Sequence, residues 1–197
     1  MRECASYERT TANTKPDRAL GLNPDLLCLC SELGISAEWL AARDLREFRE
    51  PVKLEIAEVG ADGREHRLTP EAANAWRQLK AAALADGVEL LIVSAFRSVE
   101  RQTEIVRNKL AAGCLIDDIL MLCAPPGYSE HHSGRAADLA SPGAPVLEAG
   151  FAQTEAFAWL SAHAGRFGYT LSFPPGNRFG YQYEPWHWCF DSPPVRP

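Results

Sequence analysis

The chain has 197 residues, of which 46% are hydrophobic and 23% charged, and its formal net charge is −6. This composition is ordinary for one folded domain with a sizeable core, and it excludes a membrane span, because no window approaches about 20 consecutive apolar residues. The excess of 26 acidic over 20 basic side chains also disfavours a nucleic-acid partner, since a phosphate backbone attracts basic surfaces.

The N-terminal region reads as an extension of residues 1–50 ahead of a main domain over residues 51–197. Residues 1–20 are polar and rich in turn formers, which predicts a flexible arm. Asn23-Pro24 then predicts the start of a helix that ends at Gly34, and Ser36 predicts a second short helix. The first eight residues lack the apolar segment of a secretory signal, so we expect a cytoplasmic protein, or one of the cell envelope if a leader is missing. The six cysteines are expected to be reduced.

The first part of the main domain is expected to contain a hairpin, a buried strand and two longer helices. Alternating apolar residues from Val52 to Val59, a turn at Gly60–Gly63 and a return strand at 65–68 predict a hairpin. Thr69-Pro70 predicts a helix to about residue 85, and an apolar run at 89–94 predicts a buried strand. Ser98 is expected to cap a helix that ends near residue 112, and residues 116–122 are expected to form a short helical or coil segment.

The C-terminal part adds further strands. Residues 136–140 predict a short strand that places Asp138 on an interior face, and residues 154–165 predict an amphipathic helix. Two strands at 167–173 and 181–188 are expected around a turn at 174–177. Helices that come first and strands that cluster late indicate an α+β fold with a small, largely antiparallel sheet flanked by helices.

Two short segments carry an unusual set of metal-binding side chains. Residues 129–138 read Ser-Glu-His-His-Ser-Gly-Arg-Ala-Ala-Asp, and residues 184–188 read Glu-Pro-Trp-His-Trp. A catalytic zinc takes three protein ligands and an open position for a water whose pKa falls to about 7, and a separate carboxylate must take the proton of that water. His131, Asp138 and His187 can be the ligands. Glu184 can then be the base.

These segments resemble, position by position, the Ser-x-His-x-x-Gly-x-Ala-x-Asp and Glu-x-Trp-His signatures of the zinc D-alanyl-D-alanine carboxypeptidases and dipeptidases of the VanY and VanX type. A third segment, Ser94-Ala95-Phe96-Arg97-Ser98 followed by Gln102, is similar to the Ser-x-Tyr/Phe-Arg-Ser-x-x-x-Gln element of the carboxypeptidase branch. The resemblance covers roughly residues 68–190. It departs at Phe96, where tyrosine is frequent in the family.

The resemblance implies that the main domain is a zinc peptidase whose sheet carries the metal. We expect it to hydrolyse the bond before the C-terminal residue, a D-alanine, of a peptidoglycan-type peptide. An L,D-carboxypeptidase, a D-Ala-D-Ala dipeptidase and a wall endopeptidase remain alternatives within the enzyme class. A non-catalytic module that binds wall peptides is the alternative of another class. A monomer is the default expectation.

The resemblance also distributes roles among residues. Its spacing selects His131 as the ligand and makes His132 a solvent-facing neighbour or a residue behind the ligands. Cys189 is a possible thiolate ligand, but a buried small residue is the favoured interpretation. Arg97 is expected to stabilise the oxyanion, and Gly134 to give the backbone room near the metal.

The functional assignments of the remaining positions depend on fewer observations. The family pattern places Ser98, Gln102 and Ser129 on the substrate side, and it gives Glu130 no role. Trp186 and Trp188 are expected to pack on the face opposite His187, because side chains alternate along a strand.

Overall fold

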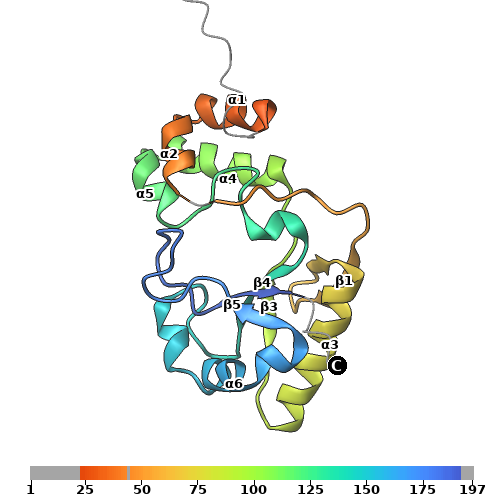
Figure 1. Cartoon of the computed structure of the whole chain (residues 1–197). Coiled ribbons are helices and arrows are strands. Elements are labelled where there is room, and N and C mark those ends of the chain that lie inside the picture. Colours follow the sequence, from red (N-terminus) through yellow and green to blue (C-terminus); the bar gives the residue numbers. More distant parts are fainter. Residues whose placement is uncertain (1–22, 44, 192–197) are drawn as a thin grey trace, which may run out of the picture.

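The computed structural model describes residues 23–43 and 45–191, so the arm expected over residues 1–20 and Cys4 lie outside the described residues. Figure 1 shows the main sheet between two groups of helices, with α1, α2, α4 and α5 on one side and α3 and α6 on the other. The helices are α1 (Pro24–Glu32), α2 (Ala37–Ala42), α3 (Pro70–Ala85), α4 (Val99–Ala111), α5 (Ile116–Leu120) and α6 (Glu155–His163), and the short 3-10 helices are η2 (Glu130–Ser133), η3 (Ala149–Gln153) and η4 (Ala164–Phe167).

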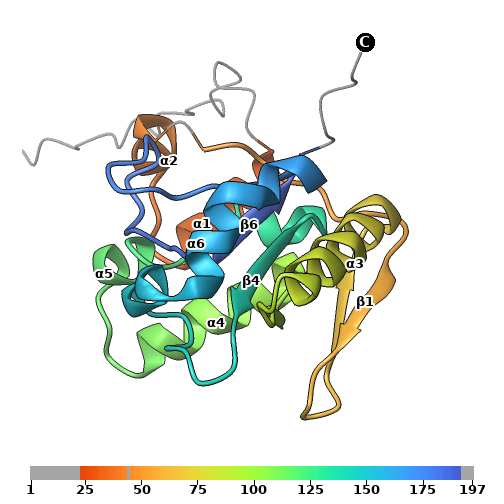
Figure 2. The same ribbon diagram turned by 90° about the horizontal axis from the view of Figure 1, so that it is seen from below.

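The main sheet is antiparallel throughout and positions the candidate site. Its strands are β3 (Leu91–Ser94), β4 (Ala136–Ala140), β6 (His187–Phe190) and β5 (Tyr169–Leu171), in that spatial order. The central strand β4 is buried along its whole length and lies between α6 and α3 (Figure 2). A separate hairpin of β1 (Glu55–Val59) and β2 (Glu65–Leu68) packs beside α3.

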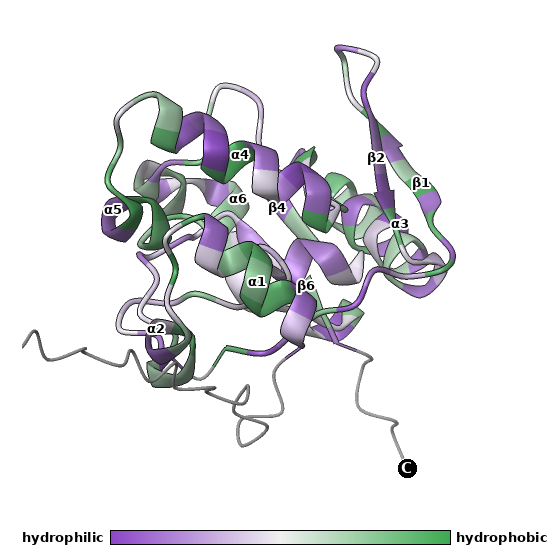
Figure 3. Cartoon of the chain, turned by 90° about the horizontal axis from the view of Figure 1, so that it is seen from above, coloured by the Kyte–Doolittle hydropathy of each residue, from purple (hydrophilic) through white to green (hydrophobic). Residues whose placement is uncertain are grey.

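Two hydrophobic cores lie within this arrangement. The sheet-side core joins the main sheet to α3 and α6, and its largest fully buried members are Leu68, Trp76, Leu79, Leu90, Leu139, Phe151, Leu160 and Tyr169. The helix-side core joins α1, α2, α4 and α5, and its members are Cys30, Leu33, Ile35, Leu40, Val106, Ile119, Leu120 and Tyr128. Burying one large apolar side chain contributes about 1.5–3 kcal/mol, so each core stabilises its own group of elements. Figure 3 shows hydrophilic and hydrophobic residues alternating along α4, as expected of a helix with one buried face.

The α+β class with a small antiparallel sheet is confirmed, and so are the helix starts read from local sequence. Asn23, Ser36, Thr69 and Ser98 each accept a hydrogen bond from a backbone N–H of the helix that follows. Within the described ranges, no helix combines the length and the hydrophobicity that a membrane span needs. The division at residue 50 stays a proposal about domain organisation. The helices α1 and α2 share the helix-side core with α4 and α5.

The strand predicted at 181–188 was wrong in its position. The strand β6 begins only at His187, because residues 185 and 186 form a turn in which the His187 N–H donates to the Glu184 carbonyl over 3.1 Å. Pro185 has no N–H to give to a sheet, which favours the turn over a continuous strand. The predicted strand at 167–173 shortens to β5 for a related reason, since residues 164–167 continue the preceding helix as η4.

Candidate active site

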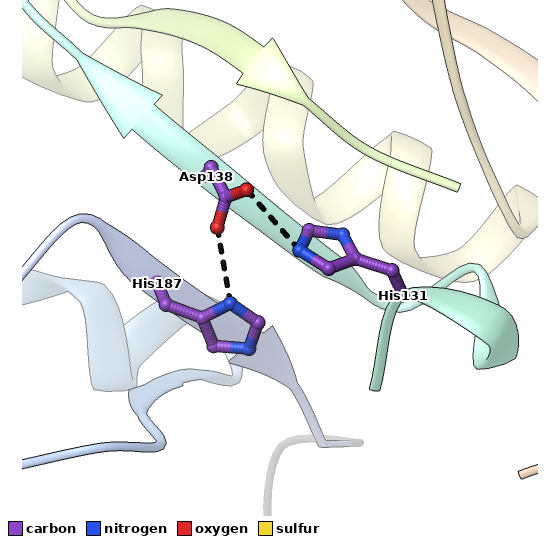
Figure 4. A group of neighbouring side chains, drawn as sticks. All are labelled: His131, Asp138 and His187. Atoms are coloured by element: carbon purple, nitrogen blue, oxygen red, sulfur yellow. Dashed lines mark hydrogen bonds and ion pairs between the residues drawn. The ribbon is translucent and has the colours of Figure 1, made fainter. Parts of the chain in front are cut away.

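Asp138 and His187 are brought together by strand pairing. Asp138 on β4 lies directly opposite His187 on β6, and cross-strand partners present their side chains on the same face. The Nδ1 atom of His187 lies 3.0 Å from Oδ1 of Asp138. Both residues are buried, so this contact is shielded from bulk water. Figure 4 shows the two side chains and His131 pointing toward one another.

His131 reaches the same carboxylate from η2. Its Nδ1–H donates to the carbonyl of Ala95 over 2.7 Å, and this fixes the ring with Nε2 turned toward Oδ2 of Asp138 at 3.2 Å. A carbonyl only accepts hydrogen bonds, so Nδ1 must carry the proton and Nε2 is left as a donor atom for a metal. The segment η2 ends at Gly134 with a φ of +65°.

Gly134 is needed for close packing against the segment of residues 51–54. A Cβ at this position would lie 2.8 Å from Cδ2 of Leu54, and the positive φ disfavours any other residue. The absence of a side chain at Gly134 is therefore required by the packing of residues 51–54, and its role near a metal stays a prediction.

Together these three residues form a possible metal site. One donor atom from each lies within 4.8 Å of the others, and all three residues are buried. Nδ1 of His187 lies 3.0 Å from Oδ1 of Asp138, and Nε2 of His131 lies 3.2 Å from Oδ2 of the same carboxylate. Two imidazoles and one carboxylate are also the donor types of catalytic zinc sites, so the residues fit the metal.

The charges in this group are tightly linked. Burial alone would lower the pKa of His187, but its contacts with Asp138 and Glu130 outweigh burial and raise that pKa to about 10. Burial alone would raise the pKa of Asp138, but the facing imidazoles hold it well below its usual range. A metal ion bound here would therefore displace a proton from Nδ1 of His187.

Glu184 stands beside the metal donors without belonging to them. The turn at Pro185 places its carboxylate on the same side as His187, with Oε2 3.9 Å from Nδ1 of that ring. Burial, together with the nearby charges of Asp138 and Glu130, raises the pKa of Glu184 to about 7. A carboxyl group with this pKa can take up and release a proton near neutral pH.

Arg97 approaches the site from the end of β3. Its guanidinium donates to Oε1 of Gln102 over 2.8 Å and lies 3.9 Å from Oδ2 of Asp138. The backbone N–H of Arg97 donates to the carbonyl of His131, which ties the arginine to the segment that carries a metal donor. The side chain of Arg97 is 20% exposed and lines the same cavity as His131, Asp138 and His187.

The site opens into a cavity of about 320 Å³. Its walls are Arg97, Lys109, Leu122, Cys123, Ala124, Ser129, Glu130, His131, Asp138, Leu147, Phe173, Tyr181, Glu184, Trp186 and His187. Lys109, Phe173 and Tyr181 were not singled out from the sequence, because nothing in their local pattern distinguishes them from ordinary helix and loop residues. Trp186 was expected to pack away from His187, but it lies in the turn before β6 and lines the cavity as well as touching the sheet-side core.

The residues expected on the substrate side differ in their placement. Ser129 lines the cavity, as a substrate contact would require. Ser98 is not among the cavity walls, and its hydroxyl accepts from the N–H of Arg101 as the cap of α4. Gln102 is 1% exposed, and its amide is occupied by Arg97 and by the carbonyl of Ala124 at 2.7 Å. Its substrate-binding role stays a prediction that this placement does not support.

His132 is fully buried, which excludes the solvent-facing alternative and leaves that of a residue behind the ligands. Its Nδ1–H donates to the carbonyl of Arg97 over 2.6 Å, and its Nε2 accepts from the N–H of Gly127 over 3.1 Å. These two bonds occupy both nitrogens, so His132 links backbone segments. Cys189, the other alternative ligand, does not belong to the group of donor atoms around Asp138.

Glu130 is the residue that sequence reasoning missed most clearly. Its Oε2 accepts hydrogen bonds from Nε2–H of His187 over 2.9 Å and from the Ser172 hydroxyl over 2.6 Å. The only sequence signal was a charged residue next to a metal-ligand candidate. Its contacts involve residues more than 40 positions away, which a local pattern does not show.

Comparison with known proteins agrees with the geometry. Residues 65–193 match the family model described as VanY: D-alanyl-D-alanine carboxypeptidase. A D-alanyl-D-alanine carboxypeptidase of Enterococcus faecalis is 28% identical over 180 residues, which are 85% of this chain and 65% of that protein. The chain spans between 36% and 65% of the length of the curated relatives it matches.

Solved structures show the same fold. The LD-carboxypeptidase LdcB is 31% identical with a TM-score of 0.65, and the match covers 72% of this chain and 69% of that one. VanYB in complex with D-alanine-D-alanine is 30% identical with a TM-score of 0.56, covering 71% of this chain and 77% of that one. A mutant of the vancomycin resistance D,D-pentapeptidase VanY in complex with Zn(II) is 28% identical with a TM-score of 0.58, covering 74% of this chain and 83% of that one.

Proposed function

The chain belongs to the VanY family of D-alanyl-D-alanine carboxypeptidases, and we propose that it is a zinc-dependent carboxypeptidase that removes the C-terminal D-alanine of peptidoglycan-type peptides. The observation that carries this proposal is the placement of Glu184. A carboxylate with a pKa raised to about 7 stands beside three converging metal donors and outside their group. Such a carboxylate is what a hydrolase needs and what a metal-storing or purely binding site does not.

We propose His131, Asp138 and His187 as the zinc ligands. The donor atoms are Nε2 of His131 and Nδ1 of His187, because the other nitrogen of each ring contacts an oxygen acceptor. A bound zinc ion would lower the pKa of a water and polarise the scissile carbonyl. The support from relatives is that a VanY enzyme is described in complex with Zn(II).

Glu184 is the proposed proton carrier. Its Oε2 takes the proton of the attacking water and then delivers it to the nitrogen of the leaving D-alanine. The raised pKa suits both halves of this transfer, since the group gains and loses a proton with little cost near pH 7. Pro185 supports the placement because it forces the turn that sets Glu184 beside His187.

Arg97 is the proposed partner for negative charge on the substrate. Its planar guanidinium offers paired donors to the scissile carbonyl oxygen as negative charge develops there. The Gln102 contact at 2.8 Å holds one face of the guanidinium and leaves the rest toward the cavity. Ser129 on the cavity wall remains our candidate for a direct substrate contact.

The proposed substrate rests on similar proteins of known structure and on one position, Phe96, that differs from the family pattern. VanYB is described with D-alanine-D-alanine bound, whereas LdcB is described as an LD-carboxypeptidase that recognises peptidoglycan. Phe96 stands where a tyrosine hydroxyl is frequent, which leaves one polar contact fewer for the peptide. We keep the terminal D-alanine of a pentapeptide as the expected leaving group and a monomer as the expected state.

A panel of muropeptides tests this proposal. The zinc-loaded protein is incubated with pentapeptide, tetrapeptide and cross-linked stems, and products are identified by mass spectrometry. We expect loss of one alanine from the pentapeptide and none from Glu184→Gln, whose amide cannot accept the proton although it is nearly isosteric. Loss of alanine from the tetrapeptide would instead assign L,D-carboxypeptidase activity, and a released dipeptide or a cleaved cross-link would assign the dipeptidase or the endopeptidase. Binding without turnover in both proteins would leave a wall-peptide-binding module.

A further inference from the structure

Glu130 occupies a position behind one of the proposed metal ligands. Its Oε2 lies 2.9 Å from Nε2 of His187, while Nδ1 of the same ring faces Asp138 at 3.0 Å. The imidazole is therefore held between two carboxylates that come from different elements, η2 and β4. The two nitrogens point to opposite sides of the ring, so Glu130 contacts the side away from the group of metal donors.

Ser172 provides a second hydrogen bond to the carboxylate of Glu130. Its hydroxyl donates to the same Oε2 over 2.6 Å. Ser172 directly follows β5, and its N–H donates to the carbonyl of His187, so it lies opposite His187 in an extension of the β5–β6 pairing. Cross-strand neighbours of this kind present their side chains on one face, which places the hydroxyl beside the imidazole.

Glu130 also belongs to the wall between two cavities. It lines the cavity that holds the metal donors and a second cavity of about 350 Å³ on the other side of Phe173 and Tyr181. The side chain of Glu130 is only 17% exposed, and that of His187 is 3% exposed. Glu130 lines the second cavity, whereas His187 does not.

We propose that Glu130, held by Ser172, is a positioning residue that orients His187 and sets its strength as a metal donor. A ring N–H that donates to a carboxylate fixes the tautomer of a metal-bound histidine and makes its other nitrogen more basic. Because Glu130 is next to His131 in the chain, one short segment supplies a metal donor and holds a second one. This inference rests on the proposed zinc site, since it assigns Glu130 through His187.

The alternative is that Glu130 is itself a metal ligand. The group of converging donor atoms consists of His131, Asp138 and His187 alone within the described ranges. Glu130 reaches this group only through the far nitrogen of His187, so the imidazole stands between its carboxylate and the other donors. The structure with Glu130 behind the ring therefore favours positioning over ligation.

The test is a comparison of zinc affinity among four variants, measured with a competing chelator at fixed pH. We expect Glu130→Ala to weaken zinc binding about 10- to 100-fold, as for other residues that hold a metal ligand from behind. Glu130→Gln keeps an oxygen acceptor and should lose less. Ser172→Ala should lose a few fold at most, because it acts through Glu130. The matched control is Glu104→Gln, a surface glutamate paired with Arg101 on α4, which should bind zinc like the natural protein.

Cobalt(II) absorption supplies a readout that a purely structural role would not change. A weaker donor at His187 should shift the visible bands of the cobalt protein in Glu130→Gln, even if Glu130→Ala fails to fold. Natural affinity and an unchanged cobalt spectrum in Glu130→Gln and Glu130→Ala would overturn the inference while leaving the zinc site intact. A natural protein that binds no zinc would overturn the proposed function and this inference together, and a zinc-bound structure with Glu130 on the metal would replace positioning by ligation.

Discussion

The two sides of the cavity hold their polar side chains in different ways. On the sheet side, Asp138 and His187 are set by backbone pairing of β4 with β6. On the helix side, Arg97 is set by a side-chain contact with Gln102 of α4, and Gln102 in turn donates to the carbonyl of Ala124 after α5. Asp138 and His187 are therefore positioned by the sheet, whereas the side chain of Arg97 is coupled to the helices. The third proposed donor, His131, lies on η2, and its carbonyl accepts from the backbone N–H of Arg97.

This difference separates metal binding from substrate orientation. A change on the sheet side should affect both the metal and the reaction. A change on the helix side should spare the metal and alter how the substrate is held. The following predictions test this separation.

The largest effect is expected for Asp138→Ala. Asp138 contacts both imidazoles and supplies the only carboxylate among the proposed donors, so its loss should abolish tight zinc binding. Turnover should fall by about 10³-fold or more, because a metal supplies several kcal/mol of transition-state stabilisation. Metal analysis after dialysis and an alanine-release assay measure the two effects. Full zinc content in the variant would remove Asp138 from the ligand set.

A smaller effect is expected for Arg97→Lys. Lysine keeps the charge but loses the paired donors, so kcat should fall by about 10²-fold with little change in KM, while zinc content stays natural. Steady-state kinetics on the free and the C-terminally amidated peptide provide the check. If the loss falls on KM, and amidation harms only the natural protein, Arg97 binds the terminal carboxylate of the substrate instead.

Gln102→Ala should have a moderate effect on the reaction and none on the metal. Without the amide, the guanidinium of Arg97 loses its 2.8 Å partner and gains freedom, so we expect a decrease in kcat of about tenfold. Zinc affinity, measured in parallel, should match the natural protein. A parallel loss of zinc would show that the two sides of the cavity are not separable. Gln182 donates its N–H to Met121 and lies outside the cavity walls, so Gln182→Ala is the matched control.

The smallest effect concerns stability between pH 7 and 9. Without zinc, the folded state raises the pKa of His187 to about 10 from an ordinary value near 6.5. The stabilisation from its proton is complete below about pH 6.5 and is lost as the pH rises toward 10, so the melting temperature should fall by a few degrees over this interval. With zinc bound, Nδ1 carries no proton and the fall should disappear. Thermal melts in a chelator and in excess zinc make the comparison. A flat profile in the chelator would contradict the assignment.

The local sequence predicted the features that depend on interactions between nearby residues. The caps at Ser36, Thr69 and Ser98 depend on hydrogen bonds to the next few residues, and each was expected. The family pattern also named the three metal donors that the structure brings together, although their role as ligands stays a proposal.

The residues that were misplaced make contacts far along the chain. Glu130 meets His187 across 57 positions, and His132 meets Arg97 across 35. Nothing in the neighbouring sequence specifies either partner. The strand expected at 181–188 failed because a turn at 185–186, stabilised by Pro185, interrupts this aromatic-rich segment.

The direct pairing of Asp138 with His187 has a consequence for engineering. Their separation is set by the ladder between β4 and β6, so it does not depend on the number of residues that connect these strands. The connecting segment can then accept an inserted peptide or a graft, provided that the strand ends keep their register. The exposed stretch around Val146 and Leu147 is a natural place for such an insertion. A library of variable loops built there would diversify the rim of the cavity, because Leu147 lines it, without displacing the residues proposed to hold the metal.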